Sequence, residues 1–280
     1  MANAVMTAAT EMNALIPELW SSNFYPTLVA KLPMIELVDM SYDGEIQSLG
    51  DQVNISAFPE FGSAVDLAES AANDAQGITV STTPLVINKQ IVQDFIVTRK
   101  ALLQSIDSVE KLNEGAMYSV MKKIQALIIA DIAPSSSAPD HSIAYDSGTT
   151  LALADILEAK ELLDAANVDE ANRKAVLGSA AINDLFNITG FVSRDFVPAG
   201  SPMSSGQFNV PVAGFEIRST TAVSTVSYFF HPSFMTLAIQ ERPNVQVFDL
   251  GADGTRATRV NLSSLLGIKQ LGSTRVVSIT

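Results

Sequence analysis

An acidic stretch without a single cation occupies much of the N-terminal third of this chain. Residues 32–88 contain no lysine and no arginine. They carry nine acidic side chains: Glu36, Asp39, Asp43, Glu45, Asp51, Glu60, Asp66, Glu69 and Asp74. Small and polar residues fill the middle of the stretch, so it cannot bury enough apolar surface to fold on itself. We expect it to pack against another surface, either the body of its own chain or a neighbouring molecule.

Alternating apolar residues predict how this stretch is built. Every second residue is apolar in residues 53–57, and the alternation returns in residues 78–80. The two runs predict the paired strands of one long hairpin. Extended patterns in residues 84–87 and 91–97 then lead the chain back toward a core.

A long helix is predicted after the extended region. Asp107 and Glu110 form a capping box, and an apolar stripe at helical spacing follows until Pro134. A helix over residues 108–133 would be about 39 Å long at ~1.5 Å per residue. The proline- and serine-rich residues 134–139 and the break at residues 146–148 predict a boundary after it.

The remaining sequence alternates between helix and strand before becoming mostly strand. Thr149 or Thr150 is predicted to cap a helix that turns Leu153, Ile156, Leu157 and Leu163 inward. Further on, we predict a strand at 175–177, a helix at 179–186 and an exposed loop at 198–207. Six strands are then predicted at 226–230, 235–239, 245–248, 256–260, 266–269 and 275–279, with turns at 231–232, 242–244 and 252–254. The fold class is α+β.

Composition excludes several classes of function. The net charge is -13, and the cations form scattered pairs such as Lys122-Lys123, which argues against a nucleic-acid binder. An acidic wall could still enclose DNA, because repulsion keeps the polymer from sticking. The chain has no cysteine, and its longest apolar run, residues 126–130, is too short to cross a bilayer. The N-terminus has no basic secretory region, so we expect a protein that is made in the cytoplasm and does not enter a membrane.

No residue pattern predicts a catalytic, cofactor-binding or metal-binding site. The chain has no phosphate-binding glycine loop and no nucleophile elbow. His141 and His231 have no companion ligands nearby in sequence, and we interpret His231 as a turn or packing residue. The acids and glycines of residues 249–254 fail the calcium-loop pattern and fit a hairpin turn better. The pairs Asp169-Glu170 and Asp155 with Glu158 are interpreted as solvated helix faces or turns without a catalytic role.

The order of these elements resembles the major capsid protein of tailed bacteriophages, which has the Hong Kong 97-like fold. The likeness covers nearly the whole chain by layout, and short motifs support it. These motifs are Leu19-Trp20 and Phe24-Tyr25, residues 50–55, residues 85–89 and 95–98, Phe230-His231-Pro232, and residues 267–269 and 275–277.

The resemblance implies a domain layout and a function. Residues 1–42 would form an N-terminal arm, 43–80 an extended hairpin called the E-loop, 81–147 and 232–280 a peripheral domain with the long spine helix, and 148–231 an axial domain. The chain would be a structural protein without enzymatic activity or cofactors. It would assemble with itself into hexamers and pentamers, forming an icosahedral or prolate head that encloses double-stranded DNA in the virion.

The resemblance also implies partners and a departure from some relatives. A separate scaffolding protein, a portal and a decoration protein are the expected partners, with assembly in the cytoplasm of a bacterial host. Some members cross-link their shells through a hairpin lysine, but residues 43–80 contain none, so we expect an uncrosslinked shell. Two alternatives remain at this point: an encapsulin-like compartment around a cargo enzyme, and an enzyme whose site forms at a subunit interface.

Overall fold

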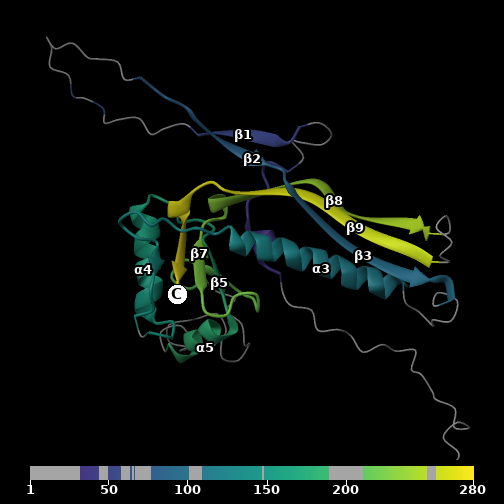
Figure 1. The fold of residues 1–280 in the computed structure, drawn as a ribbon. Coiled ribbons are helices and arrows are strands. Elements are labelled where there is room, and N and C mark those ends of the chain that lie inside the picture. The colour runs from purple at the N-terminus through teal and green to yellow at the C-terminus, as the bar shows by residue number, and fades with distance from the viewer. Residues whose placement is uncertain are drawn as a thin grey trace, which may run out of the picture.

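The structure is a computed structural model that describes residues 32–43, 50–57, 64, 66, 77–100, 109–146, 148–188, 211–250 and 257–280. The side chains of residues 109–111 lie outside this description. The described elements form an elongated body in which one end is a long sheet with a helix beneath it and the other end is a more compact α/β unit (Figure 1). A two-stranded hairpin projects from this body.

The long end is a three-stranded antiparallel sheet with the order β3-β9-β8. Its strands are β3 (Lys89–Thr98), β8 (Met235–Asp249) and β9 (Ala257–Gln270). Helix α3 (Val109–Ala130) packs across one face of the sheet, and the short helix α1 (Met34–Leu37) packs against α3. Val120, Ile124 and Ile128 of α3 are buried in one core with Leu262 and Leu266 of β9.

The compact end contains a mixed five-stranded sheet with the order β4-β10-β7-β5-β6. Its strands are β4 (Ser142–Ile143), β5 (Lys174–Leu177), β6 (Glu216–Ser219), β7 (Ser227–Phe230) and β10 (Val276–Ile279). Helices α4 (Leu153–Ala165) and α5 (Ser179–Asn187) cover one face, where Ile156 and Leu185 meet Phe229. Val176 and Phe230 belong to the core that contains α3, so both sheets share that core.

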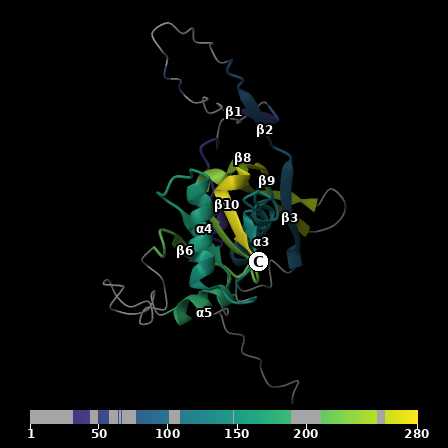
Figure 2. The ribbon, with the colours of Figure 1, turned by 90° about the vertical axis from the view of Figure 1, so that its left-hand side faces the viewer.

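The hairpin consists of β1 (Gln52–Ala57) and β2 (Ser81–Val86), paired in antiparallel register. Its root rests on a small apolar cluster in which Ile55 and Leu85 meet Ala238 of β8. Figures 1 and 2 both show the hairpin extending away from the body beyond this root. The short 3-10 helices η2 (Pro232–Phe234) and η4 (Ser273–Arg275) complete the described fold by linking the two sheets.

The long helix and most strands are confirmed, but one predicted turn does not form and two predicted strands are one. Residues 242–244 do not form a turn, because β8 continues through Pro243 to Asp249 and absorbs the extra residues as two shifts of register against β9. Proline is tolerated there since β8 is an edge strand. The strands predicted at 256–260 and 266–269 are likewise one strand, β9. The predicted turn at 252–254 lies outside the described residues.

Two further predictions need correction. The partner of β1 is β2, residues 81–86, whereas residues 78–80 lie before the strand and are exposed. Helix α4 has Ala152 as its N-cap instead of Thr149 or Thr150. Ile156 and Leu163 point inward as predicted, but the side chains of Leu153 and Leu157 are exposed because they lie on the face of α4 that turns away from the sheet.

None of the described helices combines the length and the apolar character that a membrane span requires.

Candidate functional site

The two histidines occupy structural positions. His141 is buried, its Nδ1 lies 3.0 Å from the carbonyl oxygen of Pro139, and its own carbonyl accepts from the Ser278 backbone N–H. The Nδ1 of His231 accepts the backbone N–H of Ser233 at the start of η2, which confirms the turn role predicted for His231. Burial lowers the pKa of His231 below its ordinary value of 6.5. Within the described ranges, no cluster of histidine and carboxylate side chains is placed to hold a metal ion.

The acidic side chains that could have formed a catalytic pair bind backbone groups instead. Asp155 is fully buried, which corrects its assignment to a solvated helix face. Its carboxylate accepts the backbone N–H of Ala152 at 2.7 Å and of Asp146 at 2.9 Å, and so caps the start of α4. Asp169 accepts the Ala171 N–H in a turn, as predicted. The carboxylates of Asp155 and Asp169 are therefore held by backbone N–H groups.

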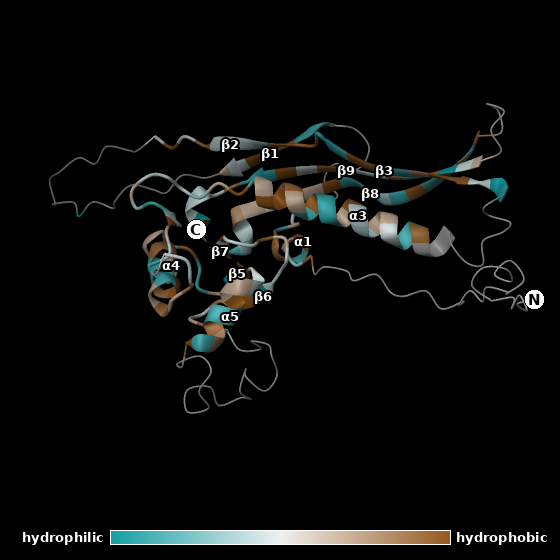
Figure 3. Cartoon of the chain, turned by 60° about the horizontal axis from the view of Figure 1, so that its bottom comes forward, coloured by the Kyte–Doolittle hydropathy of each residue, from teal (hydrophilic) through white to brown (hydrophobic). Residues whose placement is uncertain are grey.

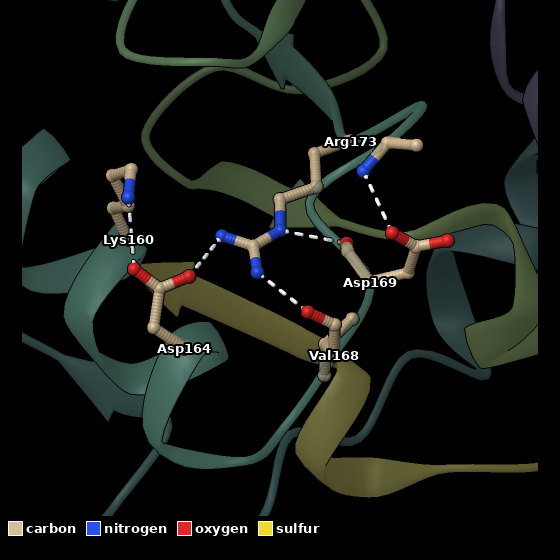
Figure 4. Close-up of polar contacts among 6 residues, drawn as sticks. Lys160, Asp164, Val168, Asp169 and Arg173 are labelled. Carbon is tan, nitrogen blue, oxygen red and sulfur yellow. Dashed lines mark hydrogen bonds and ion pairs between the residues drawn. The ribbon is translucent and has the colours of Figure 1, made fainter.

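A buried arginine, Arg173, binds the segment that connects α4 to β5 (Figure 4). The side chain of Arg173 is 2% exposed, and its guanidinium lies 2.6 Å from the carboxylate of Asp164. It also donates to the carbonyl oxygens of Val168 and Asp169. The ammonium of Lys160 binds the same carboxylate, and these two hydrogen bonds lower the pKa of Asp164. The sequence pair Arg173-Lys174 therefore contains one buried structural cation, not a binding patch.

Uncovered apolar side chains are concentrated on the hairpin and on the long sheet. On the hairpin, Ile78 is 54% exposed and Val80 is 45% exposed. Figure 3 shows the same apolar character in the chain that enters β2. On the sheet, Ile96 and Phe248 are exposed, and both stand opposite Arg259 of the central strand β9. The three side chains form one row across the sheet face that α3 does not cover, because cross-strand partners share a face.

A groove of about 500 Å³ runs between strand β3 and helix α3. Its polar and charged lining comes from Asn88, from Lys89, Gln90 and Gln93 of β3, and from Ser119 and Lys123 of α3. Ser119 Oγ donates to Gln93 Oε1 across it, and the buried Ile91 and Val120 form its floor. Among the described residues, no acidic side chain lines the groove. The sequence shows Lys122-Lys123 only as a scattered pair, because nothing local indicates that Lys123 lines the same groove as Lys89.

Comparisons with solved structures match this architecture over nearly its whole length. A chain from Mycobacterium phage Che8 is 20% identical with a TM-score of 0.77, covering 95% of this chain and 97% of its own. The capsid of cyanophage P-SCSP1u is 13% identical with a TM-score of 0.78, covering 99% and 98%. The capsid of cyanophage Pam1 is 13% identical with a TM-score of 0.74, covering 100% and 98%. The chain has the Hong Kong 97-like fold of phage capsids. The α+β fold class predicted from the sequence is therefore confirmed.

No protein-family model and no curated protein matches the sequence. At identities of 10–20% the fold is retained while the side chains have been replaced almost throughout. The functional surfaces must therefore be sought in this chain's own residues.

Proposed function

We propose that this chain is a structural major capsid protein that assembles with itself into hexamers and pentamers of an icosahedral or prolate phage head. The observation that carries the proposal is the projecting hairpin. It belongs to a fold shared with phage capsids, yet it leaves Ile78 and Val80 without cover in the single chain. Exposed apolar side chains on a projecting hairpin can gain burial against another molecule.

The free energy expected from burying the hairpin on a neighbouring subunit is of the size that shell assembly requires. At ~25 cal/mol per Å² of apolar area, a hairpin that buries a few hundred Å² on a neighbour contributes several kcal/mol before the cost of ordering. Contacts of this size, repeated around each subunit, close a shell while each one remains reversible. Such reversibility allows a misplaced subunit to leave during assembly.

The domain layout is part of the same proposal. Residues 1–42 form the N-terminal arm, 43–80 the E-loop, 81–147 and 232–280 the peripheral domain, and 148–231 the axial domain. The separate apolar cluster that α4 and α5 form with one face of the five-stranded sheet supports this division, while the other face of that sheet contributes Val176 and Phe230 to the core around α3. The pairing of β2 with β1 favours moving the end of the E-loop from residue 80 to residue 86.

The contents and partners of the proposed head are inferred from the net charge of the chain and from its similarity to phage capsids. The net charge of -13 suits a container that does not bind its polyanionic contents, and the similar structures are phage capsids. The proposed head therefore encloses double-stranded DNA in the virion and uses a scaffolding protein, a portal and a decoration protein. The same similarity favours a phage head over an encapsulin-like compartment and over an interface enzyme.

Electron microscopy of the expressed chain, alone and with a candidate scaffolding protein, tests the proposal. We expect round or elongated shells, or capsomer rings, from the purified protein. Particles recovered from infected cells should contain DNA that nuclease digests only after the shell is opened. A small compact oligomer under every assembly condition would contradict the proposed function, and particles filled with a cargo protein would support the compartment instead.

A further inference from the structure

Three segments that pass between the long sheet and the compact end meet at one place, which we call the joint. They are residues 131–141 after α3, residues 231–234 with η2, and residues 270–275 with η4. The third segment lies between the other two. The Ser273 carbonyl accepts the Ser135 N–H at 3.0 Å on one side. On the other side the Phe234 carbonyl accepts the Leu271 N–H at 2.8 Å, so the joint is a continuous set of backbone contacts.

Within the joint, His231 and Arg275 hold η2 against η4 through one residue, Ser233. The Nδ1 of His231 accepts the Ser233 N–H at 3.3 Å and lies 2.8 Å from Ser233 Oγ. The guanidinium of Arg275 donates to the carbonyl oxygen and to Oγ of the same serine, each at 3.2 Å. The His231 N–H also donates to the Arg275 carbonyl at 3.1 Å. A ring whose Nδ1 accepts a backbone hydrogen bond is neutral, with its proton on Nε2.

Protonation of the His231 ring would act against these contacts. A proton on Nδ1 removes the acceptor of the Ser233 N–H and places a second cationic donor on the hydroxyl that Arg275 already binds. Two positive charges that share one uncharged oxygen repel each other. The carboxamide of Gln270, in contrast, binds the backbone N–H and carbonyl of Ala133 at 2.7 and 2.6 Å, and this contact contains no titratable group. Protonation therefore weakens the η2–η4 contact selectively.

Charged groups on several elements act on the His231 ring. Arg275 of η4 and Arg173 before β5 disfavour its charged form. Asp169, in the connection to β5, and Asp39, which follows α1, favour the charged form. Burial is the largest influence, and it lowers the pKa of His231 below the ordinary value of 6.5. Both carboxylates already accept backbone N–H groups, whereas Arg275 shares a hydrogen-bond partner with the ring.

We propose that His231 is a proton-operated latch on the joint, whose protonation releases η2 from η4 while both apolar cores stay folded. The inference goes beyond the proposed function and does not depend on it, because the latch belongs to a single chain. Opening stays local since Phe230 and Val276, which border the joint, are completely buried in the core around α3. The latch makes the connection between the two ends of the subunit responsive to mild acid.

Proton linkage sets the size of the effect. In the open contact the ring regains its ordinary pKa of 6.5, and in the closed contact its pKa is lower. The advantage of the closed contact is therefore complete above pH 6.5 and is lost as the pH falls through the lower value. Between pH 7.5 and 5.5 the open population should rise by up to roughly tenfold, because a free imidazole becomes mostly protonated over this interval.

Hydrogen exchange of the full chain in dispersed form tests the latch, after correction for the intrinsic pH dependence of exchange. The reporting amides bond within the η2–η4 contact and belong to residues 231, 233, 234, 271 and 272. From pH 7.5 to 5.5 they should lose up to roughly tenfold more protection in wild type than in His231→Asn, which offers a neutral acceptor to the Ser233 N–H. The amides of Ala133 and Ser135, on the other side of the joint, should not show this loss.

His141→Gln is the matched control, because His141 is the second of two histidines in the chain and lies on residues 131–141 of the same joint. This variant should keep the acid-induced opening. Arg275→Gln keeps a donor but removes the second charge, so its opening should depend less on pH. Equal pH dependence in wild type and His231→Asn would overturn the latch, and so would loss of the effect in His141→Gln alone.

Two further measurements use the wild-type chain and so do not depend on whether a variant folds. An NMR titration of the histidine rings should give His231 a pKa below 6.5 in the folded chain, and a value of 6.5 or higher would overturn the latch. The core amides of Val176 and Leu262 should stay protected at pH 5.5. If they lost protection together with residues 231–234, acid would be unfolding the whole subunit, and local opening would be wrong.

Discussion

The guanidinium of Arg173 lies 2.6 Å from the carboxylate of Asp164, with the arginine buried and the aspartate partly exposed. Asp164 is at the end of α4, and Arg173 directly precedes β5, so the contact fixes how the helix returns to the sheet. Two carbonyl oxygens complete the environment of the guanidinium. Loss of these contacts should therefore lower the stability of the unit formed by α4, α5 and the five-stranded sheet.

Removing the arginine should destabilise the chain strongly. We expect Arg173→Ala to lower the free energy of unfolding by about 3 kcal/mol, a figure reduced from that of a fully buried pair because Asp164 meets solvent. Arg173→Met keeps the bulk of the side chain and separates lost packing from lost polar contacts. Asp164→Asn should cost less than either. Urea unfolding of the dispersed subunit measures all three, and equal stability of Arg173→Ala and wild type would contradict the role assigned to the pair.

A close backbone approach at the hairpin root should make Gly267 intolerant of substitution. A Cβ atom at this position of β9 would lie 2.6 Å from the carbonyl oxygen of Val86 and 3.1 Å from the Cα of Ile87. We expect Gly267→Ala to cost about 1–3 kcal/mol, because one backbone segment must move. Its melting temperature should fall, and hydrogen exchange in residues 52–57 and 81–86 should quicken.

Gly115 provides the matched control for this substitution. It lies within α3, where an added Cβ atom would meet nothing within 4 Å. Gly115→Ala should leave the hairpin unchanged and stabilise the subunit by up to about 1 kcal/mol through helix propensity. A loss from Gly115→Ala equal to that from Gly267→Ala would show that the hairpin contact is not the cause.

The elements that the sequence predicts well are those with long, regular patterns. The apolar stripe of α3 specifies a helix face, and the structure buries Val120, Ile124 and Ile128 on that face. The strand at β5 and the helix at α5 were equally well marked, because glycine and serine separate them. Such local signals do not depend on which partner is packed against them.

The errors arose where tertiary contacts override local signals. Arg242-Pro243-Asn244 is a strong turn pattern. The edge strand β8 nevertheless continues through these residues, because an edge strand needs no backbone donor on its outer side. Leu153 and Leu157 look like core residues, but Ile156, Ala159 and Leu163 already fill the space beneath α4. The groove could not be predicted from the sequence because Lys89 and Lys123 are brought together only by the packing of α3 on β3.

Stability should fall with acidification, and His231 should contribute to the first part of that fall. Burial lowers its folded-state pKa, so the folded protein binds fewer protons than the unfolded chain below the ordinary value of 6.5. Its contribution is present above pH 6.5 and is lost as the pH falls through the folded-state pKa. His231→Asn, which keeps a side-chain acceptor for the Ser233 N–H, should flatten the stability profile in that range. Denaturant titrations between pH 7 and 5 measure the difference, and identical slopes would contradict the prediction.

A second loss should occur at lower pH through two carboxylates. Hydrogen bonds from Lys160 and Arg173 lower the pKa of Asp164, and a hydrogen bond from Lys174 lowers that of Glu216. Their stabilisation is present above the ordinary values of 3.8 and 4.5 and disappears as each carboxylate is protonated. Both groups are more than a third exposed, so salt should weaken the effect. We expect the stability of Glu216→Gln to change less than that of wild type as the pH falls below 4.5, because the variant has no carboxylate to protonate beside Lys174. An identical acid-unfolding profile would show that the Lys174–Glu216 ion pair does not contribute.

The exposed apolar side chains of the hairpin should matter for assembly and not for folding. Ile78→Ser combined with Val80→Ser should change the free energy of unfolding of the dispersed subunit by less than about 0.5 kcal/mol, because both side chains are exposed there. Particle formation should need more protein, since the assembled hairpin loses apolar burial. Thr79→Asn, at the exposed residue between them, is the control. Normal assembly of the double variant would show that this part of the hairpin is not buried between subunits.

The particles should be held together without covalent bonds between subunits. Residues 43–80 offer no lysine amine for an isopeptide bond, and the whole chain offers no thiol for a disulfide. Boiling in denaturant should therefore reduce every particle to a single species of 29.8 kDa. A ladder of covalent multimers that survives boiling would contradict this expectation.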